Sequence, residues 1–329
     1  MWQYILAAIV AFALTALAGK VFIPMLIKLK FGQSIKEDGP NWHMSKQGTP
    51  TMGGIIFILP IVIAALVACI PQMLEGDFSH LLVFGFAFAF GAIGFIDDYA
   101  KITKKQNKGL SALQKFLLQV AVSVAFFTAL RFLGNFSSEL FIPFIGTVCE
   151  VPWLIYLVFM VFVSVGMVNA VNLTDGIDGL ASCVTVPVMM FFIVIAMAFT
   201  APTLGILASA TLAALFGFLI YNFNPAKVFM GDTGSLFLGG MVCGLAFAFN
   251  VPLILIPVGI IYIAETVSVI LQVGYFKLTH GKRLFKMAPI HHHFEMNGWS
   301  EKKLCFVFTL ITLIGCIVAY FGIITPYIF

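Results

Sequence analysis

Two adjacent acids stand where a long apolar run ends, in the motif GFIDDYAK. Asp97 and Asp98 close the run, and Lys101 follows Asp97 by one helical turn. A charged side chain at membrane depth costs about 2.5–3.5 kcal/mol and usually has a function. Adjacent helical residues point about 100° apart, so the two aspartates cannot play one role symmetrically. The alternative interpretation is a solvated helix end with an ion pair between Asp97 and Lys101.

A second polar group occupies the motif NAVNLTDGIDGLA, residues 169–181. Asn169, Asn172 and Asp175 recur every third residue, on roughly one helical face, and Asp178 follows beside glycines that permit close backbone approach to a ligand. Asp and Gly also form ordinary turns at helix ends. Two asparagines one turn inside an apolar run nevertheless favour a functional role.

The third acidic motif is NFNPAKVFMGDTGS, in which Asp232 lies between glycines just before another apolar run. The free amides at a helix N-terminus make a ready anion site, and Thr233 or Ser235 can cap such a helix. The motif lacks the GxxxxGK[ST] pattern, which excludes a P-loop.

A histidine run and a membrane carboxylate complete the candidates. His291, His292 and His293 lie in a basic connection. Consecutive histidines cannot all face one metal, and no cysteine partners them, so the run does not indicate a tetrahedral zinc site. Imidazoles near a phosphate can donate hydrogen bonds or move protons. Glu265 lies inside the ninth apolar run with Gln272 seven residues on, and an interhelical hydrogen-bond anchor and a ligand role are both open for it.

Long apolar helices must position these residues. The 329 residues are 61% hydrophobic and 10% charged, whereas soluble domains are about a quarter charged. A bilayer core needs about 20 apolar residues per helix. The sequence therefore predicts an all-α polytopic membrane protein, a single integral membrane domain over 1–329 whose first span is retained. The ten predicted spans are 2–24, 52–71, 81–100, 113–133, 153–172, 181–201, 203–222, 234–250, 252–275 and 304–325.

The basic residues indicate the orientation. Of the 18 lysines and arginines, 16 lie on alternate connections, all except Lys20 and Arg131. The positive-inside rule then places these connections in the cytoplasm and both termini outside. The net charge of +4 does not suggest a nucleic-acid partner, and the location of the charges is more informative than their sum. The outer connection 134–152 contains a strand-like run, which predicts a small exterior hairpin.

Several carboxylates and a basic rim at one membrane face predict an anionic, Mg²⁺-bound substrate that arrives from the cytoplasm, with the bilayer supplying a hydrophobic co-substrate. The residues alone indicate a metal-dependent membrane enzyme acting on a phosphorylated substrate. An intramembrane prenyltransferase is one alternative, although Lys101 stands where its aspartate-rich motif would have another Asp. A transporter that uses intramembrane carboxylates is the other.

Five motifs in this order, spread over essentially the whole chain, resemble the phospho-N-acetylmuramoyl-pentapeptide transferases (the MraY family). The aspartate motifs are similar to the wider polyprenyl-phosphate hexosamine-1-phosphate transferase superfamily, and the histidine motif points to the muramoyl-pentapeptide branch. The motifs are TPTMGG (49–54), GFIDDYAK (94–101), NAVNLTDGIDGLA (169–181), NFNPAKVFMGDTGS (222–235) and PIHHHFE (289–295).

The resemblance implies a reaction and a location. UDP-N-acetylmuramoyl-pentapeptide and undecaprenyl phosphate would give lipid I and UMP with Mg²⁺. The enzyme would be a homodimer in the bacterial inner (cytoplasmic) membrane, with its active site facing the cytoplasm.

The resemblance also implies roles for individual residues. Asp232 and Asp97 would be metal ligands, and Asp98 would share the catalytic role, with the division between Asp97 and Asp98 left open. His291, His292 and His293 would act at the sugar-phosphate end, and Phe229 would stack on uracil. The implied substrate-binding residues are Lys46, Lys101, Lys115, Asn172, Asp175, Asp178, Asn222, Phe229 and Gln272.

Overall fold

The computed structural model describes residues 1–29, 46–103, 109–132 and 138–328, and it is almost entirely helical. Within these ranges nine helices are long and apolar enough to cross a membrane, which confirms the all-α polytopic prediction. They are α1 (Trp2–Lys28), α4 (Ser79–Thr103), α5 (Ala112–Phe132), α6 (Trp153–Thr174), α7 (Leu180–Ala198), α8 (Pro202–Asn222), α9 (Gly231–Ala248), α11 (Ile260–Leu278) and α13 (Glu301–Ile328).

Two predicted spans differ from the helices that form. The second is the 15-residue α2 (Gly54–Ala68), which a short α3 (Ile70–Leu74) continues. The ninth is divided into η2 (Pro252–Ile254), α10 (Leu255–Val258) and α11. Proline supplies no amide hydrogen to a helix, so Pro257 inside this span removes one helical hydrogen bond, and Gly259 separates α10 from α11.

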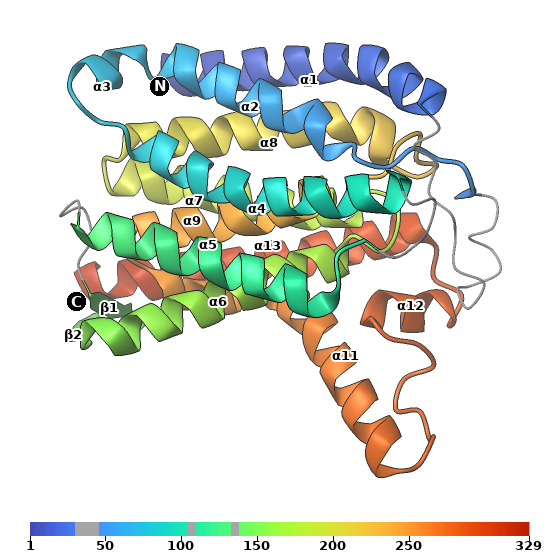
Figure 1. Ribbon diagram of the computed structural model, residues 1–329. Helices are drawn as coiled ribbons and strands as arrows, with labels where there is room; N and C mark the ends of the chain where they lie inside the picture. Colours follow the sequence, from blue (N-terminus) through green and yellow to red (C-terminus); the bar gives the residue numbers. More distant parts are fainter. Residues whose placement is uncertain (30–45, 104–108, 133–137, 329) are drawn as a thin grey trace.

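The predicted hairpin is present in the connection between α5 and α6. Strands β1 (Glu139–Ile142) and β2 (Thr147–Glu150) pair antiparallel, with Glu139 opposite Glu150. Residues 134–137 of the predicted segment lie outside the described part. The hairpin lies at the end of the bundle where α1 begins and α13 ends, as expected for an even number of passes (Figure 1).

The long helices lie roughly side by side, except that α11 departs obliquely from the bundle (Figure 1). In α9, 83% of the spanning window is buried, against 22% in α1, α5 and α11. Helix α9 is therefore the core element, and the peripheral helices expose apolar side chains of the kind that face lipid. The end of α4, the end of α6 and the start of α9 all lie at the bundle end opposite the hairpin (Figure 1). The three acidic motifs therefore lie at this end of the bundle.

Candidate active site

Three carboxylates from two helices meet at this end of the bundle. Asp97 and Asp98 lie near the end of α4 and Asp232 in the first turn of α9, and ligand oxygens of all three lie within 4.8 Å of one another. The ammonium nitrogen of Lys101 lies 2.7 Å from Asp97, 2.9 Å from Asp232 and 3.6 Å from Asp98. The Lys101 ammonium therefore contacts all three carboxylates.

Glycines allow the two helices to bring these acids together. A Cβ atom on Gly94, one turn before Asp98, would lie 2.1 Å from the Asp232 carbonyl oxygen. Gly231 has a φ of +73°, and a Cβ atom there would lie 2.6 Å from the Asp98 carboxylate. Both positions require glycine, because small residues let helix backbones approach closely. The spacing of the acids thus depends on direct backbone contact between α4 and α9.

Asp98 caps α9 from the neighbouring helix. The Thr233 amide and hydroxyl donate to the same Asp98 oxygen at 2.9 and 2.8 Å. The Ser235 hydroxyl donates instead to the Gly231 carbonyl at 2.9 Å. The prediction that Thr233 or Ser235 caps this helix is therefore wrong, because the carboxylate of Asp98 on α4 accepts the Thr233 amide in their place.

Lys115 and Asn172 complete the surroundings of Asp232. The Lys115 ammonium lies 2.9 Å from Asp232, and the Asn172 amide donates to the other Asp232 oxygen at 2.8 Å. Asn169, on the same predicted face, does not share this environment: its amide donates to Gln119 of α5 at 2.6 Å. Asn169 joins two helices, whereas Asn172 reaches the carboxylate cluster.

Asp175 lies in the turn after α6, and the Gly231 amide donates a hydrogen bond to its carboxylate. Desolvation, followed by the nearby charges of Asp232, Asp98 and Asp178, holds the pKa of the Asp175 carboxyl well above its usual range. The concentration of negative charge makes this end of the bundle attractive to cations.

A second ionic group surrounds Asp178, which is 2% exposed. The Lys46 ammonium lies 2.6 Å from one Asp178 oxygen and 2.6 Å from Glu301 at the start of α13. The structure thus brings together two predicted substrate-binding residues and a third residue that the sequence did not single out. The available signal was that Glu301 is a lone acid beside Lys302 and Lys303 in a basic connection.

The segment that carries Phe229 is held from both sides. The buried Asn222 amide donates to the Val228 carbonyl at 3.0 Å, which shapes this segment. The Phe229 amide donates to Pro50 at 2.8 Å, and the Phe229 carbonyl accepts from Gly53 at 2.9 Å. Direct contacts of Asn222 and Phe229 with a nucleotide stay predictions.

His291 and Glu265 form a fully buried pair. The His291 Nδ1 atom lies 3.0 Å from a Glu265 oxygen, and both side chains are 0% exposed. The pair joins α11 to α12 (Ile290–Glu295), so Glu265 is an interhelical anchor. The His291 ring packs so closely on Gly176 that a Cβ atom there would lie 2.3 Å from Nε2. The histidine segment therefore supports the turn that carries Asp175.

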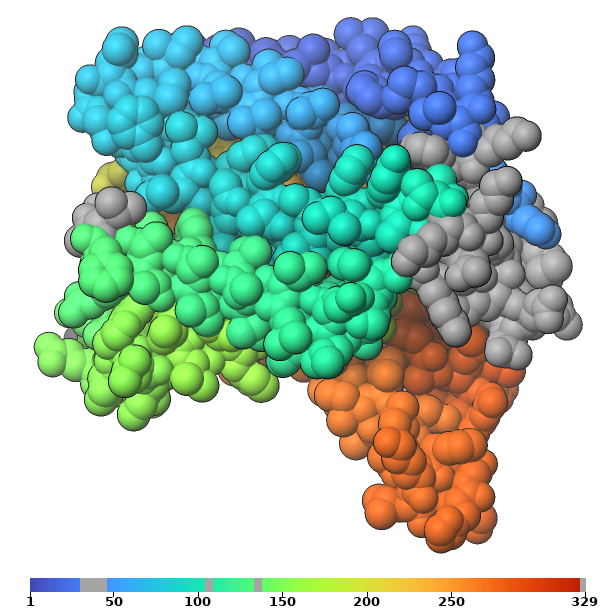
Figure 2. Space-filling view, viewed as in Figure 1, coloured from blue at the N-terminus to red at the C-terminus, as the bar shows by residue number. Residues whose placement is uncertain are grey.

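The other two histidines and Gln272 have partners away from the carboxylate cluster. His292 Nδ1 lies 2.6 Å from Glu295, and His293 Nδ1 accepts from the Lys286 amide at 3.2 Å. The Gln272 side-chain oxygen accepts from two successive amides of the segment after α11, at 3.1 and 2.8 Å. The far end of α11 and the segment that follows it project beyond the bundle (Figure 2). Substrate contacts by these three residues stay predictions.

The donor set of the carboxylate cluster fits a hard divalent cation. All the clustered ligand atoms are carboxylate oxygens, which Mg²⁺ prefers over nitrogen or sulfur. Within the described residues no histidine or cysteine joins this group. The contact of one ammonium with three acids shows directly that the cluster attracts positive charge. Together with Lys115, this arrangement can hold a phosphorylated ligand through both a cation and lysine side chains.

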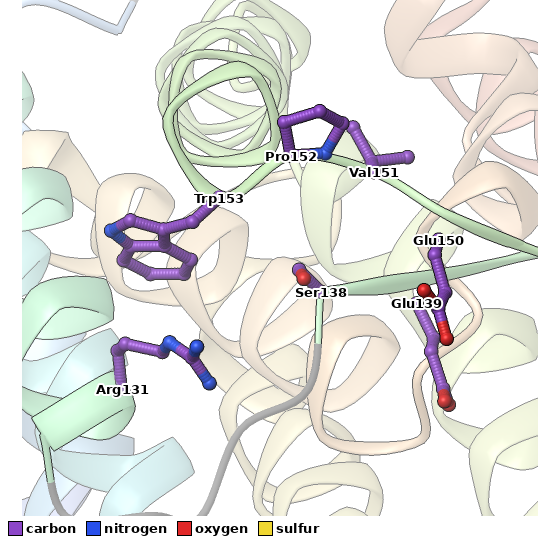
Figure 3. Close-up of a pocket in the computed structure, with 7 residues that line it drawn as sticks. All are labelled: Arg131, Ser138, Glu139, Glu150, Val151, Pro152 and Trp153. Atoms are coloured by element: carbon purple, nitrogen blue, oxygen red, sulfur yellow. The ribbon is translucent and has the colours of Figure 1, made fainter.

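A cavity of about 480 Å³ lies at the opposite, hairpin end. Figure 3 shows the Arg131 side chain beside the Trp153 indole, with Glu139 and Glu150 farther along the hairpin, and the guanidinium carbon lies 5.8 Å from the indole centroid. None of the predicted site residues lines this cavity.

Comparison with known proteins identifies the family. The profile of Glycosyl transferase family 4 matches residues 80–250, and the first phospho-N-acetylmuramoyl-pentapeptide-transferase signature matches residues 46–58. A phospho-N-acetylmuramoyl-pentapeptide-transferase of Clostridium acetobutylicum is 48% identical over 98% of this chain and 100% of its own length. Proteins of the same name from Listeria innocua and Staphylococcus carnosus are each 45% identical, covering 94% and 97% of this chain and 95% and 99% of their own. The chain therefore belongs to the phospho-N-acetylmuramoyl-pentapeptide transferase family of membrane enzymes.

Proposed function

We propose that this protein transfers phospho-N-acetylmuramoyl-pentapeptide from its UDP-linked form to undecaprenyl phosphate, which gives lipid I and UMP for cell-wall synthesis. The observation that carries the proposal is the cluster of Asp97, Asp98 and Asp232 with two lysines at one end of the bundle. The family membership supplies the substrate class.

We propose Mg²⁺ as the cofactor, with Asp232 and Asp97 as its ligands. Asp98 is the less suitable ligand, because one of its oxygens already accepts two hydrogen bonds from Thr233. The ion would neutralise charge on the diphosphate during phosphoryl transfer.

The lysines would position the phosphates. Lys101 and Lys115 converge on one Asp232 oxygen from α4 and α5, so their ammonium groups lie close together. Phosphate oxygens bound there would be held in a fixed orientation, which is the main contribution that proteins make to phosphoryl transfer. The buried pair of His291 and Glu265 would keep the Asp175 turn in place beside them.

Direct attack is the mechanism we favour. An oxygen of undecaprenyl phosphate forms a bond to the sugar-linked β-phosphorus, the bond to the bridging oxygen breaks, and UMP leaves with that oxygen. The second pKa of a phosphomonoester is about 6, so the nucleophile is mostly dianionic at neutral pH. Asp97 or Asp98 would receive any remaining proton. The rival path forms an aspartyl-phosphate, and trapping a phospho-sugar on the enzyme without lipid acceptor would establish that path instead.

Release of UMP tests the proposed function. Purified protein given UDP-N-acetylmuramoyl-pentapeptide, undecaprenyl phosphate and Mg²⁺ is expected to release one UMP per lipid-linked product, and chelation of Mg²⁺ should stop the reaction. Flux of substrate across liposomes without UMP would indicate a transporter. Turnover of labelled prenyl diphosphates would indicate a prenyltransferase. Either result would replace the proposed function.

We propose that the carboxylate end faces the cytoplasm of a bacterial cell, because the basic connections lie there. Cys149 on β2 offers a natural reporter, since it is exposed at the hairpin end. A membrane-impermeant maleimide should label right-side-out vesicles at Cys149 without permeabilisation, and Cys149→Ser should remove that label. Labelling of Cys149 only after permeabilisation would reverse the orientation.

We also propose that the enzyme is a homodimer, as the family resemblance implies. The exposed apolar surfaces of the peripheral helices are compatible with either lipid or a second copy. Mass measurement of the protein in mild detergent distinguishes a dimer from a monomer.

A further inference from the structure

The Glu301 carboxylate contacts both the Lys46 ammonium and the backbone amide of Asp178. Its Oε1 atom lies 2.6 Å from the Lys46 ammonium, and its Oε2 atom accepts from Lys46 at 2.8 Å and from the Asp178 amide at 2.9 Å. Its side chain is 12% exposed, so water contributes little to these contacts. Glu301 is the first residue of α13, which makes that helix the fixed support for both groups.

The Lys46 side chain forms ion pairs with two acids. Its ammonium contacts Asp178 and Glu301 at 2.6 Å each, and its side chain is 16% exposed. An ammonium has three donors and a flexible stem, so one carboxylate alone fixes it poorly. The second acid gives Lys46 a defined position at the start of the segment that leads to α2.

Asp178 connects this support to the Phe229 segment. Its second oxygen accepts from the Ala226 amide at 2.9 Å and from the Asn224 side chain at 3.2 Å. The Phe229 main chain in turn bonds to Pro50 and Gly53. Residues 46–53 therefore contact the Phe229 segment, the Phe229 segment contacts Asp178, and Asp178 contacts Lys46. Glu301 connects this ring of contacts to α13.

We propose that Glu301 is a positioning residue for nucleotide binding, which acts by fixing Lys46 and the Asp178 turn. The proposal rests on the function proposed above and on the nucleotide-binding roles that the family resemblance implies for Lys46, Asp178 and Phe229. Glu301 contacts no part of the carboxylate cluster among the described residues. Its loss should therefore weaken binding of the nucleotide and leave the chemical step and the lipid acceptor largely unaffected.

Glu301→Gln tests the role, because the amide keeps the size and removes the charge. Calorimetric UMP binding is expected to weaken about tenfold, as for loss of a charge-assisted hydrogen bond. The KM for the UDP-linked substrate should rise by a similar factor, while kcat and the KM for undecaprenyl phosphate stay within about threefold. Glu150→Gln neutralises an exposed acid at the hairpin end and should bind UMP as the wild type does.

Two further variants separate positioning from simple stability. Glu301→Asp keeps the charge and should recover part of the UMP affinity; it also carries the test if Glu301→Gln does not fold. In a Lys46→Met background, Glu301→Gln should weaken UMP binding by much less than in the wild type, because the two residues act together. Any of three results would overturn the proposal. They are additive effects of the two substitutions on UMP binding, an unchanged UMP affinity in Glu301→Gln, and equal increases in KM for both substrates. Failure of the wild type to release UMP would instead overturn the proposed function.

Discussion

Replacing Asp232 with Asn is expected to lower kcat for UMP release at ordinary Mg²⁺ by about a thousandfold or more, while the protein stays folded. Asp232 is the residue on which Lys101, Lys115 and Asn172 all converge. The substitution keeps the shape of the side chain and removes the charge that both lysines contact. The measurement is steady-state UMP release alongside thermal unfolding in the same detergent.

Asp77→Asn provides a matched control for this substitution. Asp77 lies at the hairpin end, where it accepts from the Ser79 amide at 2.9 Å and from the Thr203 hydroxyl at 2.7 Å. An Asn oxygen can accept one of these bonds, so UMP release should stay near the wild-type rate. Turnover by Asp232→Asn at more than a tenth of the wild-type rate would refute the role given to Asp232.

Gly94→Ala is expected to reduce UMP release about a hundredfold and to destabilise the protein by about 1–3 kcal/mol. The added methyl group would lie 2.1 Å from the Asp232 carbonyl, closer than two atoms can approach. Helices α4 and α9 must then separate, and the carboxylates of Asp97 and Asp98 move away from Asp232. Kinetics and thermal unfolding of the same preparation measure the two effects.

Gly85→Ala on the same helix is the control for this change. A Cβ atom at Gly85 would meet nothing within 4 Å, so the substitution adds a methyl group without moving α9. Alanine also favours a helix more than glycine does. Activity of Gly94→Ala equal to that of Gly85→Ala would mean that the contact between α4 and α9 does not set the geometry of the carboxylates.

The features that the sequence predicted well are those carried by local pattern. Long apolar runs predict membrane helices because the bilayer imposes a length and a composition, and nine such helices are present in the described ranges. Alternation of the spans placed GFIDDYAK, NLTDGIDG and MGDTGS at one end of the bundle, and the structure places them there (Figure 1). Asp97, Asp98 and Asp232 could therefore be grouped before any distance was known.

The features that the sequence did not predict depend on contacts between distant segments. The three-residue spacing alone could not show that the Asn169 side chain bonds to Gln119, whereas the Asn172 side chain on the same face bonds to Asp232. Similarly, the cap of α9 comes from Asp98 on α4, because the backbone contact at Gly94 brings a stronger acceptor than the local hydroxyls. Such partners follow from tertiary packing.

Glu301 and Glu265 illustrate the same limit. Each was visible as an acid in an unusual place, one among lysines and one inside an apolar run. Their partners, Lys46 and His291, lie far away in the chain, so only the folded structure distinguishes an anchor from a ligand. The break before α11 was likewise not predicted, and the structure places it at Gly259, two residues after Pro257.

Binding of Mn²⁺, measured by electron paramagnetic resonance, tests most directly whether acids from α4 and α9 form one cation site. Mn²⁺ accepts the same oxygen ligands as Mg²⁺ and is detected without turnover. The wild type is expected to bind one Mn²⁺ per chain in competition with Mg²⁺, and Asp232→Asn should lose that binding while Asp77→Asn keeps it. Unchanged Mn²⁺ binding in Asp232→Asn, or no binding by the wild type, would contradict the site.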